Sequence, residues 1–129
     1  MSTPDIRENP VSSASMGIGE LSARTGVSAR SLRYYEELGL LFPGRTPAGH
    51  RRYSSDAAVR VLLVQRLFAA GLGSTEIAPL LPWLLGGSDG RAEGIESLRA
   101  HRRELEGRIM RLRDTAEILD EVLEEHAAS

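Results

Sequence analysis

The chain has 129 residues, a formal net charge of -2 and no cysteine. Its length allows one small domain with an accessory element rather than two separate cores, and the lack of cysteine excludes disulfides, thiolate zinc sites and cysteine nucleophiles. No apolar run reaches the roughly 18 residues that a membrane-spanning helix needs, and no signal-peptide pattern is present, so we expect a cytoplasmic protein without membrane contact.

The small net charge conceals an uneven distribution of charged residues. Residues 24–66 contain eight arginines against three acids, whereas residues 91–129 contain seven arginines against ten acids. The two parts therefore have different electrostatic roles, and the basic part is suited to a polyanion such as DNA.

The first residues of the chain lead into a helix-turn-helix. Residues 1–15 contain two prolines and a serine cluster with little to bury, and we expect a disordered tail there. Residues 16–85 form the predicted DNA-binding domain, which starts with two short helices over residues 18–38. Gly26 supplies the turn between them, and the Ser28 hydroxyl can cap the second helix.

The second predicted helix has an inner and an outer face. Leu32 recurs with other apolar residues at the spacing that packs inward, whereas Arg30, Arg33 and Tyr34 fall on the outer face. Such a face suits the major groove, where arginine chelates guanine and tyrosine reaches a phosphate. The alternative for this helix alone is an ordinary solvated surface.

Residues 40–53 have the composition of a short basic hairpin. Their glycines and prolines prevent a long helix and favour turns. The hairpin carries Arg45, His50, Arg51, Arg52 and Tyr53. A basic hairpin directly after a recognition helix is typical of a wing, which contacts the flanking phosphates and fixes the register of the protein on DNA.

Residues 54–70 predict a long helix that braces the wing against the first two helices. Its expected inward stripe includes Val59, Leu62 and Leu67, and Gly71 ends the helix.

Residues 74–85 predict a last helix of the domain, which Pro79 and Pro82 should distort or kink. Near its end Leu81, Trp83 and Leu84 form a candidate effector pocket. The alternative is that Trp83 fills a gap in the core.

A flexible linker and a coiled coil are expected to follow. Residues 86–94 contain four glycines and predict the linker, and residues 95–126 carry apolar residues at heptad spacing. The apolar residues of the predicted seam are Ile95, Leu98, Leu105, Ile109, Leu112, Leu119 and Leu123. Arg102 and Ala116 occupy the two remaining seam positions, where they interrupt and thin the apolar stripe, so pairing is either local or one end packs on the DNA-binding domain. Because one protomer has no second long helix to cover this seam, we expect a homodimer, whose two-fold symmetry implies a palindromic DNA site.

The sequence resembles the MerR family of bacterial transcription regulators in three segments. These are I-G-E-L-S-A-R-T-G-V-S-A-R-S-L-R-Y-Y-E-E-L-G-L-L at residues 18–41, G-H-R-R-Y-S at 49–54 and G-L-G-S-T-E-I at 71–77. The resemblance implies a mainly α fold, in which a winged helix-turn-helix domain precedes a long dimerisation helix that pairs antiparallel. It also implies a regulator that bends and untwists promoter double-stranded DNA for RNA polymerase holoenzyme.

The DNA-contacting residues expected from the helix face, the wing and the resemblance together are Ser28, Arg30, Ser31, Arg33, Tyr34, Tyr35, Arg45, His50, Arg51, Arg52 and Tyr53. Family members that sense metals or oxidants use cysteines near the end of the dimer helix, so metal or thiol sensing of that type is rejected here. We expect no metal and no cofactor. A small-molecule effector at the candidate pocket and a regulator without an effector are both open alternatives.

Other functions compete with activation by promoter distortion. Repression is one, and DNA bending as in excisionase-type proteins, which share a related winged fold, is another. A coiled-coil adaptor that keeps the winged fold but binds protein is a third, which the basic residues of 24–66 disfavour. An enzyme is least favoured, because neither an activated nucleophile nor a phosphate-cradling loop can be read from the sequence.

Overall fold

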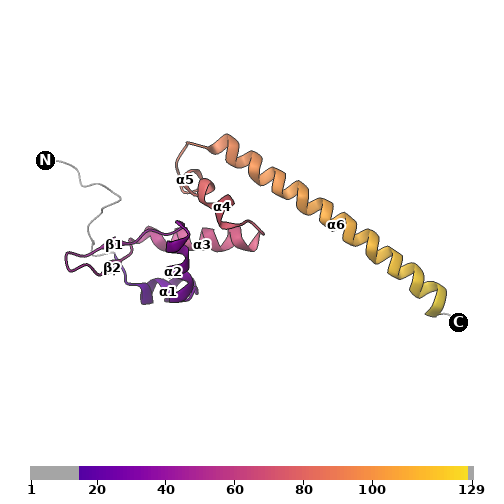
Figure 1. Cartoon of the computed structure of the whole chain (residues 1–129), viewed down its shortest axis with the longest axis horizontal. Helices are drawn as coiled ribbons and strands as arrows, with labels where there is room; N and C mark the ends of the chain where they lie inside the picture. Colours follow the sequence, from indigo (N-terminus) through magenta and orange to yellow (C-terminus); the bar gives the residue numbers. More distant parts are fainter. Residues whose placement is uncertain (1–14, 128–129) are drawn as a thin grey trace. The chain divides into compact units, whose positions relative to one another are not determined.

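The structure is a computed structural model that describes residues 15–127 (Figure 1). It divides into two units, the first ending at Asp89 and the second starting at Gly90. The predicted tail over residues 1–15 lies outside the described residues, apart from Ser15. Both units are mainly helical, which confirms the predicted fold class. Within the described range, no helix combines the length and apolar character that crossing a membrane requires.

The helix-turn-helix consists of α1 (Ile18–Thr25) and α2 (Ala29–Glu37). Gly26 ends α1 with φ of 74°, a left-handed conformation that costs glycine little. Two residues later the Ser28 hydroxyl accepts a hydrogen bond of 3.1 Å from the Ser31 amide, which caps α2 as predicted. Helix α1 packs against both α2 and α3, so α2 has a fixed support.

The wing is a small antiparallel hairpin of β1 (Gly44–Arg45) and β2 (Arg51–Arg52), with Arg45 opposite Arg51. Its base is held by an additional bridge between Met16 and Tyr53, whose amides each donate to the other residue's carbonyl at 2.8 Å. The segment before α1 therefore continues the hairpin, a long-range pairing that the sequence pattern does not reveal.

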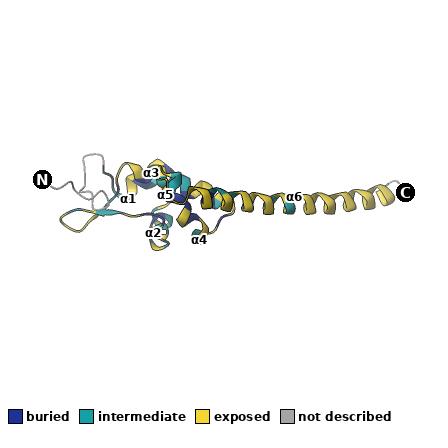
Figure 2. Ribbon diagram, turned by 90° about the horizontal axis from the view of Figure 1, so that it is seen from above, coloured by how far each residue is buried: buried dark blue, intermediate teal, exposed yellow. Residues whose placement is uncertain are grey.

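Helix α3 (Asp56–Ala69) supplies one wall of the core, which Figure 2 shows in dark blue. The core cluster consists of Met16, Leu21, Val27, Leu32, Leu41, Tyr53, Ala57 and Val61. The predicted inward stripe of α3 was correct for Leu67, which is buried, but wrong for Val59 and Leu62, which are 61% and 43% exposed; the other inward positions are taken by Ala57, Val61 and Val64. This helix is apolar on two faces, so helical spacing alone could not choose between them.

The predicted helix over residues 74–85 is three short pieces, α4 (Ser74–Ile77), the 3-10 turn η2 (Ala78–Leu80) and α5 (Leu81–Leu84). Pro79 and Pro82 lie in the second and third pieces, where each removes a backbone donor. Gly87 closes the segment by donating its amide to the Pro82 carbonyl at 2.8 Å. A Cβ at residue 87 would lie 2.7 Å from that oxygen, so this turn requires glycine.

The second unit is the 37-residue helix α6 (Arg91–Ala127). It starts four residues before the predicted coiled coil, so the linker expected over 86–94 is shorter. Its first turn is closed by the Gly94 amide, which donates to the Gly90 carbonyl at 2.8 Å, and Glu93 in that turn interacts favourably with the helix dipole. Gly94 therefore lies within the first turn of α6 rather than in a separate linker.

Candidate nucleic-acid interface

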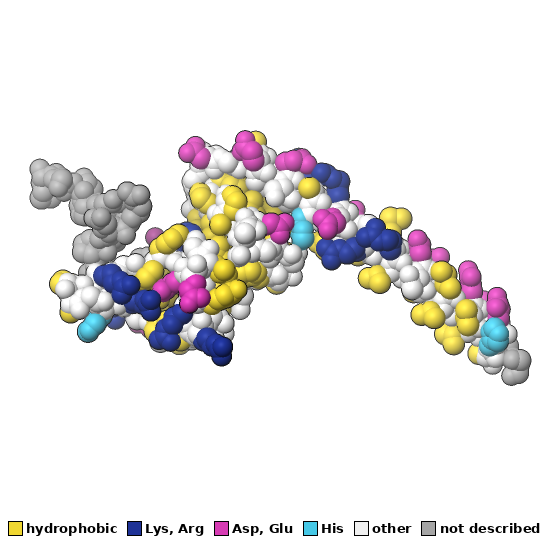
Figure 3. Space-filling view, viewed as in Figure 1, with side chains coloured by type: hydrophobic (Ala, Val, Ile, Leu, Met, Phe, Trp, Pro, Cys, Tyr) yellow, Lys and Arg dark blue, Asp and Glu magenta, His cyan; other side chains and the backbone are white. Residues whose placement is uncertain are grey.

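The outer face of α2 carries the side chains expected to meet DNA. Arg30, Arg33 and Tyr34 are all exposed, and Ser28 is exposed at the helix cap. Figure 3 shows arginine side chains gathered over the wing and the first two helices. The sequence folds in this way because Leu32 is buried on the opposite side of α2, which directs the residues one and two positions later outward.

The wing adds a second basic strip beside this helix. Arg45, His50 and Arg51 are exposed, and the turn between the strands is closed by the Thr46 amide, which donates to the His50 carbonyl at 2.9 Å. The register places Arg45 directly opposite Arg51. Like charges in such a cross-strand pair repel one another, and a bound phosphate would relieve that repulsion.

Arg51 and Arg52 point to different surroundings because successive strand residues alternate between the two faces of a hairpin. Arg51 approaches α2, where its Nε lies 3.3 Å from a carboxylate oxygen of Glu36. Arg52 is half-buried and donates through Nη2 to the Ser15 carbonyl at 2.9 Å. Both arginines were predicted to contact phosphates. In the structure, the Arg52 guanidinium instead donates to the segment before α1.

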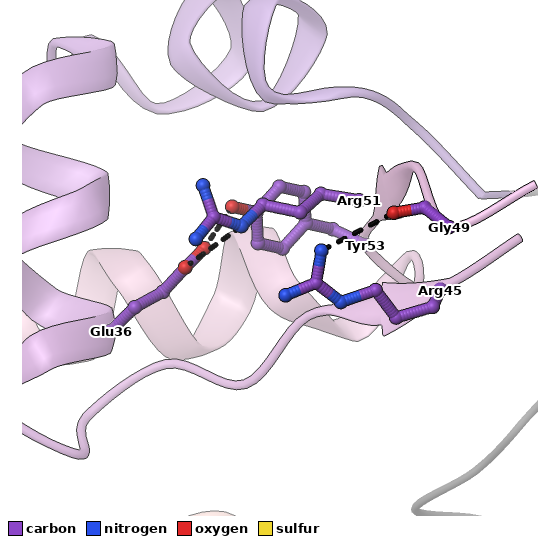
Figure 4. A network of polar contacts seen from close by, with 5 residues as sticks. All are labelled: Glu36, Arg45, Gly49, Arg51 and Tyr53. Atoms are coloured by element: carbon purple, nitrogen blue, oxygen red, sulfur yellow. Dashed lines mark hydrogen bonds and ion pairs between the residues drawn. The ribbon is translucent and has the colours of Figure 1, made fainter.

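Glu36 connects the recognition helix, the wing and the core (Figure 4). One carboxylate oxygen accepts a hydrogen bond from the Tyr53 hydroxyl, and the other pairs with Arg51. Burial, together with the hydrogen bond and negative charge of Glu36, raises the pKa of Tyr53, whereas the positive charges of Arg51 and Arg33 act in the opposite direction. Tyr53 therefore remains a protonated donor at neutral pH.

Glu36 was absent from the sequence-based set of site residues. One signal could have found it, because it follows the buried Leu32 by four residues and so lies on the same side of α2.

Two tyrosines of the predicted set are placed differently from expectation. The prediction that Tyr53 contacts DNA is corrected, because its side chain is fully buried in the core cluster. Tyr35 is half-buried, and its ring stacks on Phe68 with 5.7 Å between centroids. Burial raises the pKa of Tyr35. Of the three tyrosines, Tyr34 thus offers the most exposed ring to a ligand.

Arg60 supports the entry to the wing from α3. Its Nε donates to the Leu40 carbonyl at 2.7 Å, and its guanidinium lies 5.0 Å from the centre of the Phe42 ring. Burial lowers the pKa of Arg60. These contacts tie α3 to the segment between α2 and β1.

The candidate effector pocket lies at the end of the first unit. In the candidate effector pocket Leu81 is buried, while Trp83 and Leu84 are half-buried. Among the residues that the structure describes, no group of three or more histidine and carboxylate side chains could hold a metal ion.

The exposure of the predicted seam differs between the two ends of α6. Ile95, Leu98 and Leu105 are half-buried, whereas Ile109, Leu112, Leu119 and Leu123 are exposed.

Comparisons with known proteins place this architecture among regulators. The family described as MerR HTH family regulatory protein matches residues 16–82. The HTH-type transcriptional regulator HmrR of Sinorhizobium medicae is 33% identical over 109 residues, which cover 81% of this chain and 71% of that protein. The mercuric resistance operon regulatory protein of Bacillus cereus is 42% identical over 65 residues, which cover 50% and 49% of the two chains.

A solved structure supports the same assignment at the level of the fold. A MerR family transcriptional regulator from Listeria monocytogenes has a TM-score of 0.65 at 27% identity, and the match covers 87% of this chain and 86% of that one. For three of the curated relatives the chain spans only 37%, 49% and 51% of their length. The resemblance to this family that the sequence indicated is confirmed. The match to the family covers residues 16–82, which contain the helix-turn-helix and the wing.

Proposed function

The chain belongs to the MerR family of helix-turn-helix regulatory proteins, and from this premise we propose that it binds a palindromic promoter site as a homodimer and bends the DNA to control transcription. One observation carries the proposal. The exposed Arg30, Arg33 and Tyr34 of α2 belong to the same domain as the basic wing, which Glu36 joins to α2 through Arg51. A helix that reads base edges and a hairpin that contacts phosphates together supply sequence preference and register.

The homodimer is supported by the exposed apolar residues of α6. The second half of α6 exposes Ile109, Leu112, Leu119 and Leu123 at heptad spacing. Such a seam is costly in water, and a second copy of the same helix is the partner that matches it. Pairing through α6 would join two DNA-binding domains around a two-fold axis, which a palindromic site mirrors.

Antiparallel pairing is supported by the distribution of charge along α6. Residues 99–113 contain six arginines and two acids, whereas residues 114–125 contain six acids and no arginine. Figure 3 shows the acidic side chains along the second half of this helix. Parallel helices would place like charges side by side, whereas antiparallel helices place each basic half against the acidic half of the other copy.

Bending of the DNA is compatible with this arrangement on energetic grounds. Bending a site of promoter length costs on the order of a few kcal/mol, and the release of counterions by several arginine–phosphate contacts can offset that cost. The family relation supports control at the promoter together with RNA polymerase holoenzyme. We propose Leu81, Trp83 and Leu84 as the place where a small-molecule effector would bind.

The test is selection of bound fragments from sheared source DNA with purified protein. We expect enrichment of fragments that share a palindrome within a promoter, and weaker binding by Arg33→Ala. The matched control Arg99→Ala removes the same charge from α6 and should bind these fragments nearly as the unmodified protein does. No enrichment over input would reject the proposal and favour the protein-binding adaptor.

A further inference from the structure

A nearly buried acid lies within the basic surface that faces DNA. The Glu36 side chain is 10% exposed, and that of its partner Arg51 is 42% exposed. A negative charge at this position repels phosphate, so charge alone makes Glu36 unfavourable for DNA binding. The contacts of its two oxygens suggest a different role.

The two oxygens of Glu36 serve two different elements. The Tyr53 hydroxyl, fixed in the core at the end of the wing, donates to one oxygen and thereby orients the carboxylate. The other oxygen lies 3.3 Å from Nε of Arg51 on β2. Figure 4 shows the three side chains converging between α2 and the wing.

The ion pair with Glu36 involves Nε of Arg51 rather than its terminal Nη groups. Arginine has five N–H donors in a planar fork, and the carboxylate contacts Arg51 from its Nε side. The two terminal Nη groups are the donors that would meet a phosphate end-on. An arginine that is already ordered loses less side-chain entropy when it binds.

We propose that Glu36 is a positioning residue that holds the Arg51 guanidinium, and with it the wing, ready for a DNA phosphate. This inference rests on the proposed function. Loss of the Glu36 charge then weakens DNA binding, even though it removes a negative charge from a basic surface. The sign of the effect separates positioning from simple electrostatics.

The variant Glu36→Gln tests the sign, with Glu37→Gln as its matched control. Glutamine retains an acceptor for Tyr53 but loses the charge that orders Arg51. Glu37 is the next residue of α2 and is exposed, so Glu37→Gln reports the effect of charge alone. On the selected DNA fragment we expect Glu36→Gln to bind about three- to tenfold more weakly, the range for one disordered phosphate contact, and Glu37→Gln to bind as tightly as the unmodified protein or more so.

Two further measurements exclude a general loss of structure. In the Arg51→Ala background, Glu36→Gln should cause little additional weakening, because the group that it positions is gone. In the free protein, the NMR signal of the Arg51 Nε–H should be resolved and slowly exchanging, and Glu36→Gln should broaden it while the backbone amide spectrum is preserved.

The outcomes separate this inference from the proposed function. Equal or tighter binding by Glu36→Gln would overturn the inference while leaving the proposed function intact. An Arg51 Nε–H signal that is as broad in the unmodified protein as in Glu36→Gln would overturn it whatever the DNA result. Failure of the unmodified protein to bind any DNA would reject the proposed function, even if the Nε–H signal showed that Glu36 orders Arg51.

Discussion

The substitution Leu112→Glu should dissociate the homodimer that we propose to form through α6. Leu112 is 69% exposed in the protomer, so about two thirds of its side chain remains to be buried. Full burial of a leucine stabilises by about 1.5–3 kcal/mol, which leaves about 1–2 kcal/mol per copy and about 2–4 kcal/mol per dimer. The dimer Kd should therefore rise by roughly 30- to 1,000-fold, and the cost of burying a carboxylate would add to this.

Sedimentation equilibrium over a range of concentrations measures that Kd directly. Met110 provides a matched control, because it is 64% exposed in the same helix turn but lies outside the heptad seam. Met110→Glu should leave the dimer Kd within a few fold of the unmodified value, about the effect of one surface charge. Equal weakening by both variants, or an unchanged Kd for Leu112→Glu, would refute the assignment of the seam.

Three other predictions concern the wing, the core and the direction of pairing. Arg51→Ala should reduce the salt slope of log K for DNA by about 0.9, as expected for one lost phosphate contact, and binding titrations at several salt concentrations measure it. Tyr53 has a raised pKa in the folded protein, so the stability that it contributes is present below its ordinary pKa of about 10 and should decline as the pH rises above that value. The free energy of unfolding, measured in urea at several pH values, should decline less steeply with pH for Tyr53→Phe. A spin label at Glu125→Cys should give a separation of roughly 35 Å in an antiparallel dimer whose axis passes between residues 113 and 114, whereas a distance below about 20 Å would indicate parallel helices.

Local signals in the sequence predicted the helix-turn-helix well. Gly26 and Ser28 act through their own backbone neighbourhood, one by a left-handed φ and the other by capping the next helix. Such interactions depend on a few adjacent residues, so they can be read without knowledge of the tertiary structure. The outward direction of Arg30 and Arg33 followed from the same helical periodicity.

The errors concern residues whose environment is set by distant parts of the chain. Tyr53 pairs with Met16, which lies far from it in the sequence, and Arg52 donates to Ser15 in the same N-terminal segment. Helix α3 has apolar residues on two faces. Its packing against α1 buries one face, and Val59 lies on the exposed one. Long-range contacts of this kind leave no mark on hydrophobic periodicity.

Hydroxyl-radical footprinting of the selected DNA fragment tests most directly whether α2 and the wing read a palindrome as a dimer. We expect two protected patches related by two-fold symmetry, both lost in Leu112→Glu at concentrations where the unmodified protein is fully bound. A single asymmetric patch that persists in Leu112→Glu would show that the protein binds this site without forming the proposed dimer.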